Sequence, residues 1–408
     1  SNAITAIATC GITQPTIIEL AGTYSSSTQV TLPPISGASS INTITIRPEL
    51  SHTGFTLQST TVSPALTFSS TSYWIVDGRP GSQGSSRAIT IKNTFNGAGP
   101  AISFASSTSA LGSHDNTIKY AKILSNNNSI SSGAIYFGAI TFASATTGNS
   151  NNIVANCDIS YATTKQLANV IYSDGASGKI NNLNTISSNN IYDFFISTAA
   201  TNAINLNTYN DNWVLSSNNF YQTAVVPANT ANAFTIIKLG ANVNGTQILN
   251  NYFGSAAADH SGMLDYGAYN QQNGSFSVVT ATSGVGTLTP TSIQGNTISN
   301  INISSNANTT HTLFNLGAGY FNIGTVTGNT FGSTTANDKL NLLSAANSVS
   351  NHALMIYVNG SNDGDVVNIN NNVFGGIKLG YRTGATTGAA STLDVIKVYS
   401  TQTGSGAG

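Results

Sequence analysis

The densest mixture of aromatic and hydrogen-bonding side chains in this chain lies in SAAADHSGMLDYGAYNQQNGSF, residues 255–276. Tyrosine rings can stack on sugar rings, while carboxylates, imidazoles and amides bind sugar hydroxyls, which is the usual division of roles in a polar ligand site. The sequence therefore predicts a carbohydrate-binding loop here, with a loop that only packs over the fold as the alternative. The candidate ligand-binding residues are Asp265, Tyr266, Tyr269, Gln271, Asp259 and His260.

Two further carboxylates stand close together in SNDGD, where Gly364 separates Asp363 from Asp365. Carboxylates at this spacing can turn onto one hard cation, so the pair is the candidate calcium site, with a solvated turn as the alternative. Calcium is the single cofactor that the sequence offers. The other acids are scattered singly, and His114 and His352 have no partner visible in the sequence, so we interpret both as surface residues and assign no catalytic residue.

A repeated pattern supplies the scaffold for these residues. An asparagine followed two positions later by a large apolar residue recurs, as in SSNNIY (187–192) and SSNNFY (216–221). The intervals range from 28 residues, Asn93 to Ala121, to 45 residues, Asn251 to Asn296, which favours a common coil with loops of different length. The pattern positions are Asn93, Ala121, Cys157, Asn189, Asn218, Asn251, Asn296, Asn329 and Asn372.

Short runs such as RAITIKN (87–93) and FTIIKLG (234–240) alternate β-branched or aromatic residues with small or polar ones, as strands do. Three such runs per repeat predict an all-β, right-handed parallel β-helix of about nine to twelve coils. Asparagine tolerates the left-handed backbone of a sharp turn, and amides at one corner can stack. We therefore interpret the pattern as an asparagine ladder, a structural feature, in which Ala121 and Cys157 are substitutes.

Composition limits the partners. Charged residues make up 7% of the 408 residues and the formal net charge is −1, so nucleic acid and anionic membrane surfaces are unsuitable partners. No apolar run reaches the roughly 18 residues of a membrane span. Cys10 and Cys157 are too few for a disulfide framework, and we expect two unpaired thiols.

The expected organisation is a remnant of tag removal at 1–3, an N-terminal cap or first incomplete coil at 4–40, one β-helix domain at 41–400 and a flexible tail at 401–408. We expect a monomer.

Several segments together, NTITIRP (42–48), YWIVDGRPGSQGSSRAITIKN (73–93), GKINNLNTISSNNIYDFF (178–195) and FNIGTVTGNTFG (321–332), resemble the large secreted parallel β-helix repeat proteins of Bacteroidetes-type bacteria. The resemblance implies a secreted or cell-surface protein that acts in adhesion or carbohydrate binding, as a fragment of a larger protein. Its partner would be a polysaccharide or a cell-surface glycan. The alternatives are a β-helix polysaccharide lyase or glycoside hydrolase, and a purely structural stalk. Whether the chain is an enzyme stays open, but the scattered acids argue against it.

Overall fold

The structure is a computed structural model that describes residues 2–21, 24–26, 29–52, 54–105, 111–138, 146–163, 167–226, 232–267, 274–305, 309–344, 352–359, 366–381 and 392–399. The chain divides into two compact units, Ser1–Ile196 with Thr201–Asn219 and Ser197–Ala200 with Phe220–Gly408. Among the described residues, no helix has the length and apolar character that crossing a bilayer requires.

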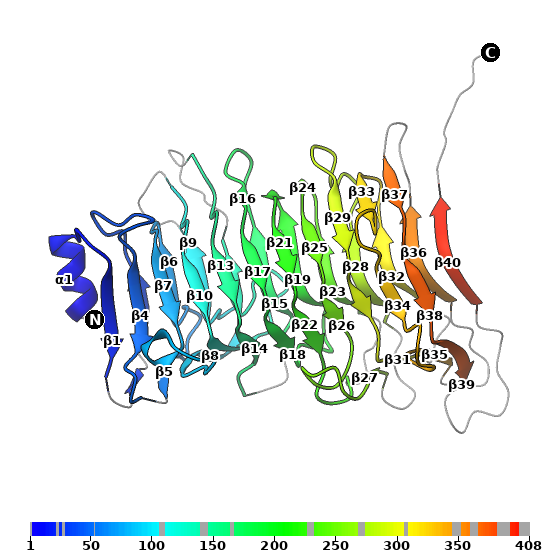
Figure 1. Ribbon diagram of the computed structural model, residues 1–408, viewed down its shortest axis with the longest axis horizontal. Coiled ribbons are helices and arrows are strands. Elements are labelled where there is room, and N and C mark those ends of the chain that lie inside the picture. The colour runs from blue at the N-terminus through cyan, green and yellow to red at the C-terminus, as the bar shows by residue number, and fades with distance from the viewer. Residues whose placement is uncertain are drawn as a thin grey trace, which may run out of the picture. The chain divides into compact units, whose positions relative to one another are not determined.

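Consecutive strands of the first unit fall into three different sheets, and every strand pairs in parallel with the strand of the next coil (Figure 1). The first sheet contains β1 (Thr16–Leu20), β4 (Ile44–Pro48), β7 (Trp74–Asp77), β10 (Thr117–Lys119), β13 (Ile153–Ala155), β17 (Thr185–Ser187) and β21 (Val214–Ser216). The second contains β2 (Tyr24–Ser26), β5 (Phe55–Ser59), β8 (Ile89–Gly97), β11 (Ala121–Asn127), β14 (Asp158–Tyr161) and β18 (Asn190–Tyr192). The third contains β3 (Val30–Leu32), β6 (Leu66–Ser69), β9 (Ile102–Ala105), β12 (Ile135–Phe137), β15 (Asn169–Asp174) and β19 (Thr201–Thr208).

The second unit repeats this arrangement and adds a fourth parallel sheet. Its first sheet contains β25 (Gln247–Leu249), β29 (Thr291–Gln294), β33 (Phe321–Ile323) and β37 (Val367–Ile369), and its second β26 (Tyr252–Phe253), β30 (Thr297–Ile298), β34 (Thr330–Gly332) and β38 (Val373–Gly375). The third contains β23 (Phe234–Leu239), β28 (Phe276–Ala281), β32 (Thr310–Leu316), β36 (His352–Asn359) and β40 (Thr392–Tyr399). The fourth contains β27 (Leu264–Tyr266), β31 (Ile301–Ser305), β35 (Leu340–Ser344) and β39 (Ile377–Tyr381).

The remaining elements are short: α1 (Asn2–Cys10), the 3-10 turn η1 (Pro80–Ser82), and the strands β16 (Asn181–Asn182), β20 (Asn210–Asp211), β22 (Asn219–Tyr221) and β24 (Val243–Asn244). Each unit is therefore built from the coils of a right-handed parallel β-helix, which confirms the fold class predicted from the sequence.

Equivalent residues of successive coils stack inside each unit, because parallel in-register pairing places each residue above its counterpart. In the third sheet of the first unit, Phe68, Phe104 and Phe137 form a continuous stack, with ring centroids 4.7 Å and then 4.3 Å apart. Burying one such side chain contributes about 1.5–3 kcal/mol. The recurring apolar residues of the sequence thus form the core.

The asparagine ladder is present as hydrogen-bonded steps within each unit. In the first unit, the backbone N–H and side-chain Nδ2 of Asn189 both donate to Oδ1 of Asn218, each at 3.0 Å, and Cys157 N donates to Oδ1 of Asn189. In the second unit the same two bonds join Asn251 to Asn296 and Asn296 to Asn329. They also join Asn329 to Asn372.

Two details of the predicted ladder were wrong. Asn93 lies in register with Ser125, so Ile89, the register partner of Ala121, occupies the ladder position of that coil. Asn93 instead donates to the carbonyls of Thr61, Ser63 and Pro100. The left-handed residue is also not the ladder asparagine but the residue before it: Asn156, Ser188, Ser217, Asn250, Gly295 and Asn371 all have positive φ.

The first unit contains a further asparagine stack that we did not predict. Asn116 donates through its backbone N–H and its Nδ2 to Oδ1 of Asn152, which donates in the same way to Asn184. These three residues precede strands of the first sheet. Each is followed two positions later by a buried apolar residue, so the same pattern marks a second corner of the coil.

The N-terminal segment contains more regular structure than we expected. Residues 2–10 form helix α1, which includes two of the three residues interpreted as a tag remnant. Strands β1, β2 and β3 pair with β4, β5 and β6, so three strands of a coil are present in this segment.

Interrupting the asparagine ladder is expected to lower the free energy of unfolding. Replacing Asn296 with leucine removes an amide that accepts two hydrogen bonds and donates two in a fully buried place. We expect Asn296→Leu to lower the free energy of unfolding by about 1–3 kcal/mol, because the neighbouring donors lose their acceptor. Chemical denaturation measures this change. The matched control is Asn359→Leu at an exposed position, and equal stability of the two variants would contradict a stabilising ladder.

Candidate functional site

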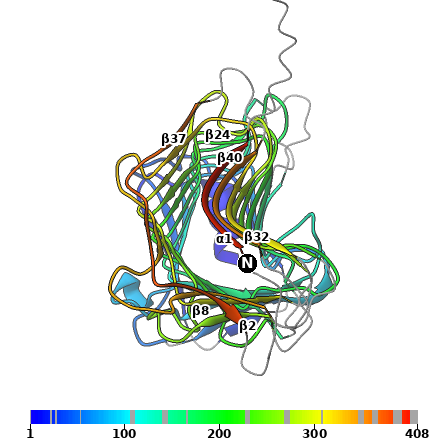
Figure 2. The ribbon, with the colours of Figure 1, turned by 90° about the vertical axis from the view of Figure 1, so that its right-hand side faces the viewer.

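A polar groove of about 410 Å³ lies on the outer surface of the third sheet of the second unit. The alternation of buried and exposed residues is interrupted in three neighbouring strands, each of which buries four consecutive residues: 276–279 on β28, 311–314 on β32 and 353–356 on β36. Such an interruption bends a strand. Figure 2 shows these strands strongly curved.

The groove is lined mainly by hydrogen-bonding side chains. On β32 and β36, the lining residues on either side of the interruption are three positions apart: Thr312 and Asn315, and Leu354 and Tyr357. Leu354 is the single aliphatic residue among them. The lining residues are Ser275, Ser277, Thr310, Thr312, Asn315, His352, Leu354, Tyr357 and Lys397.

Charged and titratable side chains gather at the groove. Nε2 of His352 lies 3.0 Å from Oδ2 of Asp394. Tyr357 is in register with Asn315 on one side and Lys397 on the other. Lys397 Nζ lies 3.9 Å from Oδ2 of Asp394, too long for a hydrogen bond. His352 thus has a carboxylate partner, which corrects its interpretation as a surface residue without one.

Asp394 lies beside charged or titratable groups of two other residues. Its Oδ2 lies 3.0 Å from Nε2 of His352 and 3.9 Å from Nζ of Lys397. The imidazole, the carboxylate and the ammonium group therefore lie close together and offer several hydrogen-bonding groups to one bound ligand.

One of the tyrosines in the loop predicted to bind carbohydrate cannot contact a ligand. Tyr266 is fully buried, and its hydroxyl donates to the Gly274 carbonyl at 3.1 Å. It lies in the core because β27 pairs with β31 and places Tyr266 beside Ile303. The expectation that Tyr266 stacks on a sugar ring was wrong. Burial also raises the pKa of its hydroxyl above the ordinary value.

The other residues of this loop do not converge with Tyr266. Asp259 is exposed and its Oδ1 accepts from the N–H and hydroxyl of Ser261. His260 stacks on Tyr252, with ring centroids 3.6 Å apart, and burial lowers its pKa. Asp265 is half-buried on β27. Tyr269 and Gln271 lie outside the described residues.

The candidate calcium site, Asp363 with Asp365, also lies outside the described residues and stays a prediction. Within the described part of the chain, no group of three or more His, Cys, Asp or Glu side chains could hold a metal ion. Cys157 is fully buried, and burial raises the pKa of its thiol to about 12, so it is inert at neutral pH. Cys10 is exposed, and both cysteines are free.

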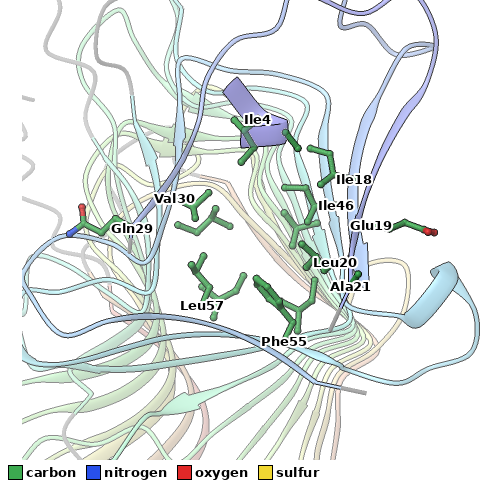
Figure 3. Close-up of a pocket in the computed structure, with 15 residues that line it drawn as sticks. Ile4, Ile18, Glu19, Leu20, Ala21, Gln29, Val30, Ile46, Phe55 and Leu57 are labelled. Atoms are coloured by element: carbon green, nitrogen blue, oxygen red, sulfur yellow. The ribbon is translucent and has the colours of Figure 1, made fainter. Parts of the chain in front are cut away.

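A second cavity, of about 370 Å³, lies inside the first coils of the first unit beneath α1 (Figure 3). Ile18, Leu20, Ile46, Phe55 and Leu57 line it, whereas the side chain of Glu19 points away from it (Figure 3). Its lining is almost wholly apolar, so it offers no set of groups that could recognise sugar hydroxyls. We assign it to the packing of the N-terminal end.

The charged residues of the first unit are mostly paired with one another. Asp77 is 1% exposed and accepts from Arg79 Nε at 2.9 Å and Nη2 at 2.8 Å, with Lys119 Nζ at 3.5 Å. The Arg79 guanidinium lies 4.4 Å from the centroid of the Tyr120 ring. His114 Nδ1 lies 2.7 Å from Oδ2 of the adjacent Asp115, which corrects its interpretation as unpartnered. The contacts of Lys119 with Asp77 and of Arg79 with Tyr120 bridge neighbouring coils and stabilise the scaffold.

No family model matches the chain, and no curated protein matches it. Solved structures that are similar to the chain include the following three. Two are structures of PfbA, a surface adhesin of Streptococcus pneumoniae. The first is 13% identical to this chain, and the match covers 96% of this chain and 94% of the PfbA chain with a TM-score of 0.45. The second is also 13% identical, and the match covers 94% of this chain and 88% of the PfbA chain with a TM-score of 0.41. The third is alginate lyase from Paenibacillus sp. str. FPU-7, 12% identical, covering 92% of this chain and 95% of the lyase with a TM-score of 0.34. Because these TM-scores lie below 0.5, the fold assignment rests on the strand pairing alone.

Sequence reasoning missed the groove because its residues come from four strands that are far apart in the chain. Each strand taken alone reads as an ordinary buried strand. The available signal was the pair of adjacent apolar residues between two polar positions in Thr312-Leu-Phe-Asn315, which recurs in register as Ser277-Val-Val-Thr280 on β28.

Proposed function

We propose that the protein binds an extended carbohydrate chain in the groove formed by β28, β32, β36 and β40, and that it acts in adhesion as a secreted or cell-surface protein. The observation that carries the proposal is the groove itself, a hollow of about 410 Å³ lined by hydroxyls, an amide, an imidazole, a phenol and an ammonium group. Polar groups that converge on a concave surface are the usual features of a ligand site.

The arrangement of the lining residues supports a ligand that follows the strands. The lining residues of β36 run from His352 to Tyr357, which are five residues apart, or about 15 Å along a strand. A chain of several sugar units can contact residues along this whole length, whereas a single sugar contacts only some of them.

The proposal predicts the effect of substitutions at both ends of the groove. On a glycan array followed by titration calorimetry, we expect Tyr357→Ala and His352→Ala each to weaken binding of the retained oligosaccharide by about 10-fold, the loss of roughly one good polar contact of 1–1.5 kcal/mol. Leu288→Ala, at an exposed position away from the groove, is the matched control and should bind as the wild type. Unchanged affinity in both groove variants would contradict the site.

The second candidate function is a polysaccharide lyase, which the adjacency of Tyr357 and Lys397 favours. In a β-elimination, the ammonium group would neutralise a uronate carboxylate and the ionised phenol oxygen of Tyr357 would take the proton from the carbon next to that carboxylate. A C=C bond would form as the glycosidic C–O bond breaks, and the phenol so formed would return the proton to the leaving oxygen. The measurement is release of unsaturated uronate, followed by its ultraviolet absorbance. Turnover that disappears in Tyr357→Phe would favour the lyase, whereas binding without turnover favours adhesion.

A further inference from the structure

The polar groove is lined by one lysine, Lys397, and by no aspartate or glutamate. The carboxylate of Asp394 lies 3.9 Å from Lys397 Nζ, beyond the distance of a hydrogen bond. Within the described part of the chain, Lys397 Nζ has no hydrogen-bonded acceptor, and its side chain is 45% exposed. The three N–H groups of this ammonium group can therefore bind a ligand in the groove.

The carboxylate of Asp394 is hydrogen-bonded to a different residue of the groove. Nε2 of His352 lies 3.0 Å from Oδ2 of Asp394. The imidazole donates this bond, because an ionised carboxylate can only accept. Asp394 is thus bound to His352, while the ammonium group of Lys397 lines the groove without a hydrogen-bonded counterion.

The residues beside Lys397 can donate further hydrogen bonds. Lys397, Tyr357 and Asn315 lie in one register row on three adjacent strands, about 4.8 Å apart from strand to strand, and all three line the groove. The phenol offers an O–H donor and the amide an NH₂ donor. Donors grouped around an ammonium group suit a carboxylate or a sulfate, whose oxygens form charge-assisted hydrogen bonds.

The sheet that carries the groove has an excess of positive charge. In the second unit, the described strands of the third sheet contain two lysines, Lys238 and Lys397, and one carboxylate, Asp394. The whole chain has a formal net charge of −1, so the positive excess is local to this sheet. A surface with an excess of one sign favours ligands of the opposite sign.

We propose that the carbohydrate bound in this groove is anionic, and that Lys397, Tyr357 and Asn315 hold a carboxylate or sulfate group of one of its sugar units. This inference rests on the proposed function and names the class of ligand for the same groove, whether or not the ligand is cleaved. Asp394 limits the affinity, because its negative charge close to Lys397 opposes an anion there.

The test compares acidic oligosaccharides with matched neutral ones on the intact chain, by titration calorimetry at physiological ionic strength. One pair is a hexamer of galacturonic acid and its methyl ester, and the other is a sulfated galactan hexamer and its desulfated form. We expect the acidic member of at least one pair to bind about 10-fold more tightly than its neutral partner, because it accepts charge-assisted hydrogen bonds. The pair that shows this difference distinguishes carboxylate from sulfate.

Two substitutions should change the affinity for that acidic member in opposite directions. Lys397→Gln removes the ammonium group and is expected to weaken binding by about 10-fold. Asp394→Asn keeps an oxygen that accepts from His352 but removes the opposing charge, so binding is expected to strengthen by about 3-fold. Neither substitution should change the affinity for the neutral member by more than about 2-fold. Circular dichroism verifies that each variant is folded.

The matched control is Lys238→Gln on the same sheet. Lys238 points outward, since its neighbours Ile237 and Leu239 are fully buried. It belongs to the register row of Lys397 but lies on β23, four strands away, or about 19 Å. Because charges are screened over about 8 Å at physiological ionic strength, the affinity should be that of the wild type.

Several results would overturn the anionic class. Equal binding of the acidic and neutral members in both pairs would do so while leaving carbohydrate binding in place, as would an acidic preference that persists in Lys397→Gln. If none of the four oligosaccharides binds, the glycan array decides. Retention of acidic glycans supports the inference, and retention of neutral glycans alone overturns it without affecting the proposed function. Retention of no glycan overturns both.

Discussion

Asp77→Ala is expected to lower the free energy of unfolding of the first unit by about 3–5 kcal/mol, the usual cost of removing one partner of a buried ion pair. Asp77 is 1% exposed and holds two bonds from Arg79 and the ammonium group of Lys119. Without the carboxylate, two cations remain close together, and their side chains are only 19% and 30% exposed. Urea denaturation, followed by tryptophan fluorescence of the nearby Trp74, measures the loss.

The matched control is Glu19→Ala, which removes the carboxylate of the Arg47–Glu19 pair in the same unit. Glu19 is 46% exposed, and Arg47 keeps bonds to the Gly81 carbonyl and the Ser82 hydroxyl, so we expect a cost of about 1 kcal/mol or less. If Asp77→Ala were no more costly than Glu19→Ala, burial of the Asp77 pair would not contribute to stability.

The contribution of Asp77 to the free energy of unfolding also depends on pH. Burial alone raises the pKa of this carboxyl, but the hydrogen bonds from Arg79 and the charge of Lys119 outweigh burial, and the pKa is lowered. A carboxyl with a lowered pKa stabilises the fold above its unfolded value, near 3.9. This contribution is lost as the pH falls through the folded pKa, and it is absent in Asp77→Ala.

The fold could be predicted from the sequence because its main constraint is local and repeated. Each coil must place an apolar residue inward just after a corner. SSNNIY and SSNNFY are two copies of the segment that does so. Asn93 was misplaced because it satisfies the same three-residue pattern in the middle of β8 instead of at the start of a strand. Only the strand register, in which Asn93 lies beside Ser125, distinguishes the two positions.

The site was harder to predict, because whether a loop tyrosine is buried depends on pairing between distant segments. Tyr266 reads as a loop residue in a long interval between repeats, yet its segment pairs with Ile301–Ser305 and joins the core of a fourth sheet. His352 and Asp394 are 42 residues apart, and no spacing rule joins them. Polar residues on the outside of a β-helix become neighbours through coil stacking, which depends on the length of every intervening loop.

A buried histidine in the second unit is expected to make the stability of this unit depend strongly on pH. His311 on β32 is 1% exposed, and its Nδ1 accepts the backbone N–H of Phe276 at 3.2 Å. Nε2, which carries the proton of the neutral ring, has no hydrogen-bond partner in the described structure. Tyr266 lies beside the ring, with centroids 6.5 Å apart. Burial lowers the pKa of His311 to about 4, because this apolar site has no group that would stabilise the imidazolium ion.

The lowered pKa makes the second unit sensitive to mild acid. Below pH 6.5 the unfolded chain binds a proton at His311, whereas the folded chain stays neutral at this residue until about pH 4. The free energy of unfolding is therefore expected to fall between these pH values, by about 3 kcal/mol in total from this residue. Denaturation curves at a series of pH values between 7 and 4.5 measure most of the decline.

Carboxyl groups also titrate toward the lower end of this range, so the decisive quantity is the difference between the wild type and His311→Gln. Glutamine retains an amide oxygen that can accept the N–H of Phe276 but cannot bind a proton in this range. We expect the variant to be less stable than the wild type at pH 7, where it packs less well, and to lose less stability on acidification. The matched control is Leu313→Ala, which changes a buried neighbour on β32 that does not titrate, so its curve should stay parallel to that of the wild type. Parallel stability curves for the wild type and His311→Gln would contradict this prediction. They would show that the folded protein binds a proton at His311 as readily as the unfolded chain does.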